Sequence, residues 1–224
     1  MLFRSDIVTK GSGLGSSSAF TVGLVKAISN LRLDSNTRQQ CAEIACEIEM
    51  NKCGYPVGKQ DQYAAAFGGM NLFEFKRNGS VSVQPIGITK PSIQGLQDKL
   101  MLVYSGRGRD ANNILQKQQK AMSKKDKFEL VRRSKDKAYT ALDLLNKNKL
   151  DDFGYLLHEA WMDKKGVCEE ITQDYFDTIY NTAIRAGAFG GKLLGAGGGG
   201  FFLFYVPENH RTHVEGAISH KHKD

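Results

Sequence analysis

Proline and cysteine are scarce in this 224-residue sequence, with four of each, and no long apolar run occurs. A membrane-spanning helix needs about 20 consecutive apolar residues, so a membrane-spanning protein is excluded. We also expect no membrane among the partners of the protein. Four cysteines are too few for a disulfide scaffold, and their spacing matches no zinc-binding pattern. We therefore expect buried, reduced thiols in a cytoplasmic protein. The early charge at Arg4 also predicts that the chain has no secretory signal peptide.

The composition excludes intrinsic disorder of the whole chain. Apolar residues make up 41% of the sequence and charged residues 25%, and the apolar residues are dispersed along it. These values are typical of folded proteins. The length allows one large domain or two small ones, with a sizeable hydrophobic core.

A net charge of +7 is concentrated in residues 117–137, where nine lysines or arginines face three acidic residues. Nucleic-acid binding is one interpretation of such a stretch. Its apolar residues follow helical spacing, however, which favours a solvated helix face and no nucleic-acid partner. A positive field would also help to capture an anionic substrate.

The periodicity predicts an irregular alternation of helices and strands. Helices are predicted at 16–31, from a cap at Asp34 or Ser35 to about residue 51, and at 110–122, 126–146, 150–164 and 174–186. Strands are predicted at 71–76 and 80–86, as a hairpin around an Asn-Gly turn, and at 100–104, 191–194 and 201–206. The first helix is mostly apolar and is expected to be largely buried. The pattern predicts an α+β fold, with lobes at 1–97 and 98–224.

The first of three glycine clusters, Gly11-Ser-Gly-Leu-Gly-Ser-Ser-Ser, opens directly into a predicted helix. Glycines let the backbone approach an anion, and the N–H groups at a helix start favour negative charge. The serines can donate to phosphate oxygens or bind magnesium through a hydroxyl. The cluster matches neither a Walker A loop nor a Rossmann loop. A purely structural cap is the alternative.

The second cluster, at residues 54–69, places Asp61 at the start of a helix. The helix dipole stabilises a carboxylate there as the anion, which suits a base that takes a proton from a hydroxyl. Glu49 stands near the end of the preceding helix, where a negative charge is unfavourable, and Mg²⁺ would relieve that cost. The alternative is that Asp61 is a helix cap and Glu49 a surface residue.

The third cluster, within 190–204, contains four consecutive glycines between two apolar strands. Such a run has a high cost in chain entropy, so it indicates a place where the backbone passes close to something else. A flexible linker is a poor alternative, because strand-like residues flank it immediately.

In this order, GSGLGSSSAF, GKQDQYAAAFGG and KLLGAGGGGFFLFY resemble the motifs of the GHMP kinase superfamily, named for galactokinase, homoserine kinase, mevalonate kinase and phosphomevalonate kinase. With HEAWMDKKG at 158–166, they are most similar to its D-glycero-D-manno-heptose 7-phosphate kinases. The resemblance extends from Gly11 to Val206. It implies a two-lobed α+β fold, with a ribosomal-protein-S5-like N-terminal lobe, incomplete here, and a ferredoxin-like C-terminal lobe.

The resemblance implies transfer of the γ-phosphoryl group of ATP to the anomeric hydroxyl of a sugar phosphate, with Mg²⁺. Asp61 would orient or deprotonate that hydroxyl, and Ser17 and Glu49 would hold the metal. The ATP phosphates would contact the first motif: Gly11, Gly13, Leu14, Gly15, Ser16, Ser17 and Ser18. The third-motif loop, which packs beside the first cluster in the family, would be Gly195, Gly197, Gly198 and Gly199.

Two arginines, Arg107 and Arg109, are our candidates for binding the phosphate that the sugar already carries, because arginine can bind phosphate bidentately. Exposed surface arginines are the alternative.

Family members carry a substantial segment before the first motif found here, whereas about ten residues precede Gly11. We therefore expect a fragment that lacks strands of its N-terminal lobe and exposes apolar surface. Galactokinase-like or fucokinase-like substrates remain open, and so does an inactive relative with a binding role. The sequence predicts no oligomeric state.

Overall fold

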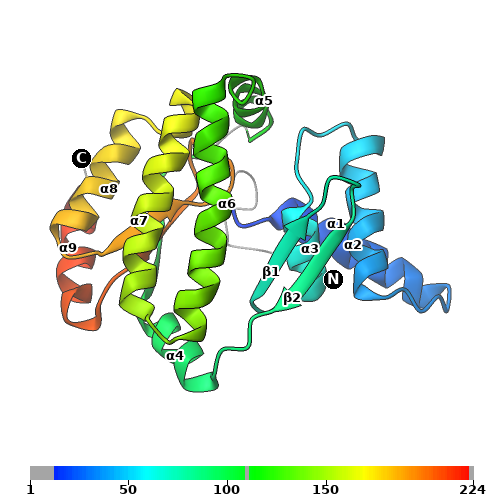
Figure 1. Ribbon diagram of the computed structural model, residues 1–224, viewed down its shortest axis with the longest axis horizontal. Helices are drawn as coiled ribbons and strands as arrows, with labels where there is room; N and C mark the ends of the chain where they lie inside the picture. Colours follow the sequence, from blue (N-terminus) through cyan, green and yellow to red (C-terminus); the bar gives the residue numbers. More distant parts are fainter. Residues whose placement is uncertain (1–12, 109–110, 222–224) are drawn as a thin grey trace. The chain divides into compact units, whose positions relative to one another are not determined.

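The computed structural model describes residues 13–108 and 111–221. By its contacts, the chain forms two compact units. The N-terminal unit comprises Gly15–Ile86, and the C-terminal unit comprises the described residues from Gly87 onward together with those before Gly15. Each unit combines helices with a small antiparallel sheet (Figure 1), which confirms the α+β prediction. In the described ranges, no helix has both the length and the apolar character needed to cross a membrane.

The N-terminal unit is built from helices followed by a hairpin: α1 (Ser16–Leu31), α2 (Arg38–Cys46), the π-helix η1 (Glu47–Lys52), α3 (Gln60–Phe67), β1 (Asn71–Phe75) and β2 (Val81–Pro85). The two strands pair antiparallel, with Phe75 opposite Val81. In the turn, the Asn78 side chain accepts a hydrogen bond from the Ser80 N–H. The predicted hairpin is confirmed. Tyr63 of α3 lies at the centre of this unit's small core.

Helix α1 is far less buried than predicted. Its buried residues lie on the side that packs against α2, α3 and η1: Ser18, Val22, Val25 and Ser29. An apolar stripe on its other side is exposed: Phe20 (72%), Leu24 (48%), Ile28 (44%) and Leu31 (84%). The prediction was wrong because an apolar helix needs only one packed face, and no described element of this unit covers the second.

The cap of the second helix is Thr37, not Asp34 or Ser35. The Thr37 hydroxyl accepts from the Gln40 N–H, and the Gln40 side chain accepts from the Thr37 N–H. This reciprocal capping box satisfies two helix-start donors at once, which a single acidic cap would not do. The helix then continues beyond Cys46 as the π-helix η1, close to the predicted end.

The C-terminal unit contains helices and three strands: α4 (Lys90–Lys99), β3 (Leu100–Tyr104), α5 (Ala111–Ala121), α6 (Lys125–Asn146), α7 (Leu150–Val167), η2 (Glu169–Ile171), α8 (Asp174–Arg185), β4 (Gly190–Leu193), β5 (Phe201–Tyr205), η3 (Glu208–His210) and α9 (Arg211–Lys221). The strands and four of the helices were predicted. Helices α4 and α9 were not.

Helix α4 lies where the sequence suggested a boundary between lobes. Thr89 caps it, and Pro91 occupies its first turn, where a missing N–H costs nothing. Helix α9 is mostly polar, and it is held by Val214 and Ile218, four residues apart and both buried. Two apolar contacts in a polar segment are too weak a periodic pattern to predict a helix.

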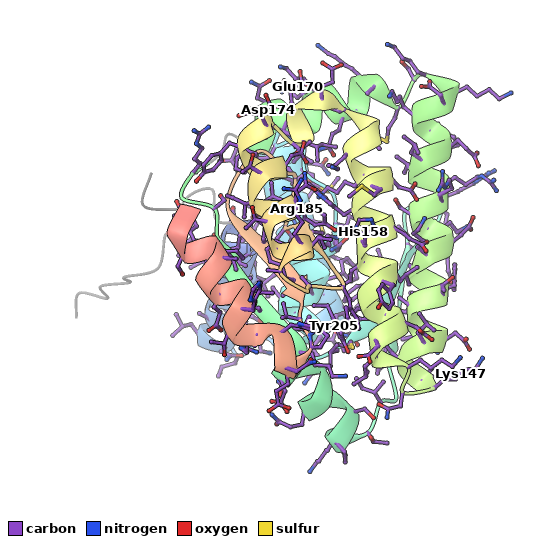
Figure 2. All side chains as sticks on the ribbon, turned by 90° about the vertical axis from the view of Figure 1, so that its left-hand side faces the viewer. Lys147, His158, Glu170, Asp174, Arg185 and Tyr205 are labelled. Carbon is purple, nitrogen blue, oxygen red and sulfur yellow. The ribbon has the colours of Figure 1, made fainter. Side chains whose placement is uncertain are left out.

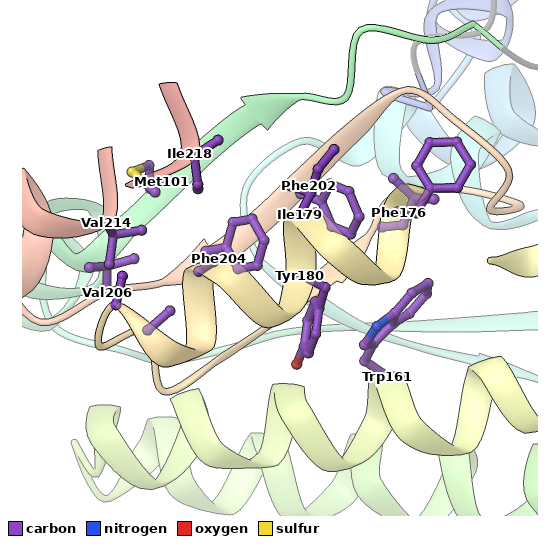
Figure 3. Close-up of a cluster of buried hydrophobic side chains, with 14 of the residues drawn as sticks. Met101, Trp161, Phe176, Ile179, Tyr180, Phe202, Phe204, Val206, Val214 and Ile218 are labelled. Atoms are coloured by element: carbon purple, nitrogen blue, oxygen red, sulfur yellow. The ribbon is translucent and has the colours of Figure 1, made fainter. Parts of the chain in front are cut away.

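The core of the C-terminal unit forms on one face of its sheet, whose strand order is β3-β5-β4. Phe202 and Phe204 of β5 point into this core, where Trp161 of α7 and Tyr180 of α8 meet them (Figure 3). Each of these four side chains is at most 1% exposed. The strand alternation therefore fixes which face packs against the helices.

Helix α7 passes unusually close to strand β4. A β-carbon built on Gly190 would lie 2.2 Å from the backbone oxygen of Gly154 and 2.7 Å from the backbone nitrogen of His158. Real β-carbons do not approach backbone atoms this closely. Only a glycine at position 190 therefore allows this packing.

All four cysteines are free thiols. Cys41, Cys46 and Cys168 are buried as expected, and burial raises the pKa of Cys46 to about 11. Cys53 is exposed, so the expectation of buried thiols was wrong there; it follows the end of η1, outside the core.

Candidate functional site

The first motif forms the start of α1, as predicted. Gly15 is the N-cap in the left-handed conformation, with φ 68° and ψ 23°, and no side chain caps the helix. No acidic residue occupies the first turn. Since the first N–H groups of a helix have no partner within it, this end is suited to bind an anion. Gly11 lies outside the described residues.

A buried carboxylate, Glu49 of η1, lies directly behind this helix start. Its Oε1 accepts hydrogen bonds from the hydroxyls of Ser17 (3.1 Å) and Thr21 (2.9 Å). Its Oε2 accepts from the Ser18 hydroxyl (2.8 Å) and from the Gln62 side-chain amide. Two other segments of the chain, α1 and α3, thus converge on one carboxyl group.

Among the described residues, only neutral donors contact the Glu49 carboxylate. The residue is 3% exposed, and no lysine or arginine of the described chain forms an ion pair with it. A buried carboxylate without a cationic partner has a large desolvation cost, which hydrogen bonds offset in part. A bound cation would lower that cost further. The alternative that Glu49 is a surface residue is wrong.

The oxygen atoms of Ser17 and Glu49 are of the type that binds a magnesium ion. Adjacent oxygen ligands of octahedral Mg²⁺, at about 2.1 Å from the metal, are about 3 Å apart. Ser17 Oγ and Glu49 Oε1 are joined by a hydrogen bond of 3.1 Å, and two oxygens this far apart could also both bind Mg²⁺. Within the described residues, no three His, Cys, Asp or Glu side chains gather into a metal cluster. Phosphate and water oxygens would therefore complete the shell, as is usual for Mg²⁺.

Asp61 lies beside the same helix start. It is an exposed residue in the first turn of α3, whose N-cap is Lys59, so the alternative that Asp61 is the cap is wrong. A β-carbon built on Gly15 would lie 3.5 Å from Asp61 Oδ2. The structure therefore brings Asp61, Glu49 and the start of α1 together within the N-terminal unit.

Sequence reasoning missed the three residues that complete the shell around Glu49: Ser18 as a Glu49 donor, Thr21 and Gln62. The sequence could have indicated Thr21, because it lies one helical turn after Ser17 on the same face of the helix. Gln62 stands in a mostly apolar helix directly after Asp61. A buried polar residue in that position indicates a specific partner.

The third motif is a tightly held loop in the C-terminal unit. Its glycines adopt φ values that other residues avoid, including Gly197 (99°), Gly198 (68°) and Gly199 (144°). The Gly198 N–H donates to the Ile171 carbonyl, and Lys164 and Gln118 donate to the carbonyls of Gly195 and Ala196. The loop is thus held by hydrogen bonds between its backbone and three residues outside it, and a flexible linker is excluded.

Arg107 lies next to this loop, and Arg109 lies outside the described residues. The Arg107 carbonyl accepts from the Gly200 N–H at 2.9 Å, which fixes its backbone. Its guanidinium lies 4.0 Å from the centre of the Tyr175 ring, a cation–π contact. Arg107 is an exposed residue, so its donor groups can be reached by an anion.

Much of the positive charge in residues 117–137 is neutralised within the C-terminal unit. Five of its nine basic residues form ion pairs: Lys117 with Glu170, Lys127 with Asp126, Arg132 with Glu129, and Arg133 and Lys137 with Asp163. Helix α6 extends to the edge of the unit, where Lys147 follows it (Figure 2). This pattern agrees with the predicted solvated helix face.

Two family models match the chain. The model for the N-terminal domain of GHMP kinases matches residues 2–69, and the model for the C-terminal domain of GHMP kinases matches residues 141–223. The first match includes the cluster around Glu49, and the second includes the third motif.

Individual relatives agree with these matches. A D-glycero-alpha-D-manno-heptose 7-phosphate kinase from Campylobacter jejuni is 35% identical over 89% of this chain and 59% of its own length. The crystal structure of a D-glycero-D-manno-heptose 1-phosphate kinase from Bacteroides thetaiotaomicron has a TM-score of 0.71, with 30% identity over 94% of this chain and 58% of that one. A galactokinase from Pyrococcus furiosus is 26% identical over 93% of this chain and 64% of its own. The chain thus spans less than two thirds of these relatives.

Proposed function

The chain belongs to the GHMP kinase family, and on that premise we propose that it is an ATP-dependent sugar kinase. Its acceptor would be D-glycero-D-manno-heptose 7-phosphate, and its product the 1,7-bisphosphate. One observation carries this proposal: the start of α1, the buried Glu49 and the exposed Asp61 converge within one compact unit. The heptose phosphate kinases among the relatives support the choice of acceptor.

In this proposal, the N-terminal unit binds the triphosphate and activates the acceptor. The start of α1 binds the ATP phosphates, and Ser17 and Glu49 hold Mg²⁺, which would neutralise phosphate charge. Asp61 accepts the proton of the anomeric hydroxyl. The sugar oxygen then forms a bond to the γ-phosphorus as the bond to the β-phosphate oxygen breaks, and ADP leaves. The anomeric hydroxyl is more acidic than an ordinary alcohol, so a carboxylate can serve as its base.

The acceptor assignment predicts a ranking of substrates. With ATP and Mg²⁺, the value of kcat/KM for heptose 7-phosphate should exceed that for galactose and fucose by about 100-fold or more, because the sugar phosphate adds charge-assisted contacts worth about 1.5–3 kcal/mol each. Release of ADP measures the rate, and phosphorus NMR of the product identifies the new ester at C1. Equal turnover of galactose or fucose would contradict the acceptor. Binding of ATP without turnover of any sugar would contradict the kinase itself.

We further propose that Arg107 binds the 7-phosphate of the acceptor. Its backbone is fixed by Gly200 and its guanidinium by Tyr175, so little side-chain freedom is lost on binding. Replacing Arg107 with glutamine should raise the KM for heptose 7-phosphate about 10- to 100-fold and leave kcat nearly unchanged. The KM for the unphosphorylated heptose should not change. A KM for heptose 7-phosphate equal to that of the unmodified protein would show that Arg107 is only a surface arginine.

A further inference from the structure

Gln62 is a fully buried amide that uses only one of its two ends. The residue is 0% exposed, and its Nε2 donates to Glu49 Oε2. Its Oε1 is buried and accepts no hydrogen bond within the described part of the chain. A buried acceptor without a partner costs about 1–3 kcal/mol. Gln62 therefore makes its one bond, to Glu49, while its own oxygen stays buried without a partner among the described residues.

The orientation of this amide follows from its partner. If the amide were flipped, Gln62 Oε1 would face Glu49 Oε2, and two acceptors would repel each other. The nitrogen therefore faces the carboxylate, which fixes the donor direction. Gln62 thus determines where Glu49 Oε2 lies.

The two oxygens of Glu49 have different surroundings. Both donors to Oε2 are buried, since Ser18 is 5% exposed and Gln62 fully buried. The donors to Oε1 are the exposed Ser17 and the half-buried Thr21, whose hydroxyls can rotate. Oε2 is therefore the fixed end of the carboxylate, and Oε1 is the end open to a ligand.

We propose that Gln62 is a positioning residue for the cation site, an inference that rests on the function proposed above. By holding Oε2, it turns Oε1 toward the position that Ser17 shares, where Mg²⁺ would accompany the ATP phosphates. Gln62 directly follows Asp61 on α3, and adjacent residues of a helix point about 100° apart. Helix α3 therefore carries both groups: the buried Gln62, which orients the carboxylate of Glu49, and the exposed Asp61, which would be the base for the acceptor.

Replacing Gln62 with methionine tests this proposal, because methionine has a similar volume and no donor. In the unmodified protein, Mg²⁺ should increase the affinity for ATP, and a certain Mg²⁺ concentration gives half of that increase. In the variant, this concentration should rise about 10- to 100-fold, as it does when groups that orient metal ligands are removed. Affinity for ATP without Mg²⁺ should stay within about twofold, since the start of α1 is untouched. Isothermal titration calorimetry with a non-hydrolysable ATP analogue measures both quantities.

A matched control is Gln39→Met, in the same unit, where the lost amide contacts Glu43 and Tyr63 instead. It should leave the Mg²⁺ dependence unchanged. Should Gln62→Met fail to fold, Gln62→Asn keeps the amide but is one methylene too short, and the same loss is expected.

Two results would overturn the proposal: an unchanged Mg²⁺ dependence in a folded Gln62 variant, or equal losses of ATP affinity with and without Mg²⁺, which indicate a merely structural role. If the unmodified chain itself shows no Mg²⁺-dependent ATP binding, the proposed function and this inference fail together. If the unmodified chain shows Mg²⁺-dependent ATP binding and the Gln62 variant shows the same dependence, only the inference about Gln62 fails.

Discussion

Replacing Asp61 with asparagine should lower kcat for heptose 7-phosphate by about 10³-fold, within the range measured for loss of a general base. The amide keeps the shape of the side chain beside Gly15 but cannot accept the hydroxyl proton. Affinity for ATP should stay within about threefold, because the start of α1 and Glu49 remain as they are. Initial-rate kinetics and calorimetry on the same sample separate the two effects.

Asp34→Asn is the matched control for Asp61. Asp34 is an exposed residue in the connection between α1 and α2, and its substitution should leave both kcat and ATP affinity unchanged. Retained turnover in the Asp61 variant would mean that the base has been misidentified. A parallel loss of ATP affinity would assign Asp61 to nucleotide binding instead.

Replacing Gly190 with alanine should destabilise the C-terminal unit by about 3 kcal/mol or more, at or above the upper end of ordinary overpacking. The added methyl group would meet backbone atoms of α7, so no side-chain rotation can relieve the clash. For a protein of this size, such a loss corresponds to a fall in Tm of about 6–12 °C. The chain has one tryptophan, Trp161, buried in this unit's core, so its fluorescence reports the unfolding directly.

Gly216→Ala is the control for this substitution. Gly216 lies in α9 of the same unit, and a β-carbon there meets nothing within 4 Å. Alanine favours a helix over glycine by about 1 kcal/mol, so this variant should be slightly more stable. Unfolding of the Gly190 variant at the Tm of the unmodified protein would contradict the close approach of α7 to β4.

Local patterns in the sequence predicted most of the elements. The Asn78-Gly79 turn defined the hairpin, and the glycine run indicated the tightly held third motif. These features depend on residues that are neighbours in the sequence, so a short stretch of sequence is enough to predict them. The same holds for Asp61 at the start of α3.

Features that depend on distant residues could not be predicted in this way. The shell around Glu49 joins residues 13 to 32 positions away along the chain, and no local pattern reports such contacts. Exposed apolar surface was expected, but the sequence did not place it at Phe20 and Leu31, because apolar periodicity shows that a helix has a packing face but not how many of its faces are covered. Thr37 was missed because Asp34 and Ser35, which precede it in the sequence, are residue types preferred over threonine as helix caps.

The π-helical geometry of η1 has a consequence for how this segment tolerates changes in length. A π-helix closes each hydrogen-bonded ring with one residue more than an α-helix. Loss of one residue between Cys46 and Glu49 would let α2 continue as an ordinary α-helix, but it would move Glu49 closer to Cys46 along the axis and change the direction in which its carboxylate points. A deletion that preserves the helix would thus remove the acidic group from the serines of α1, so this stretch should vary in sequence far more readily than in length.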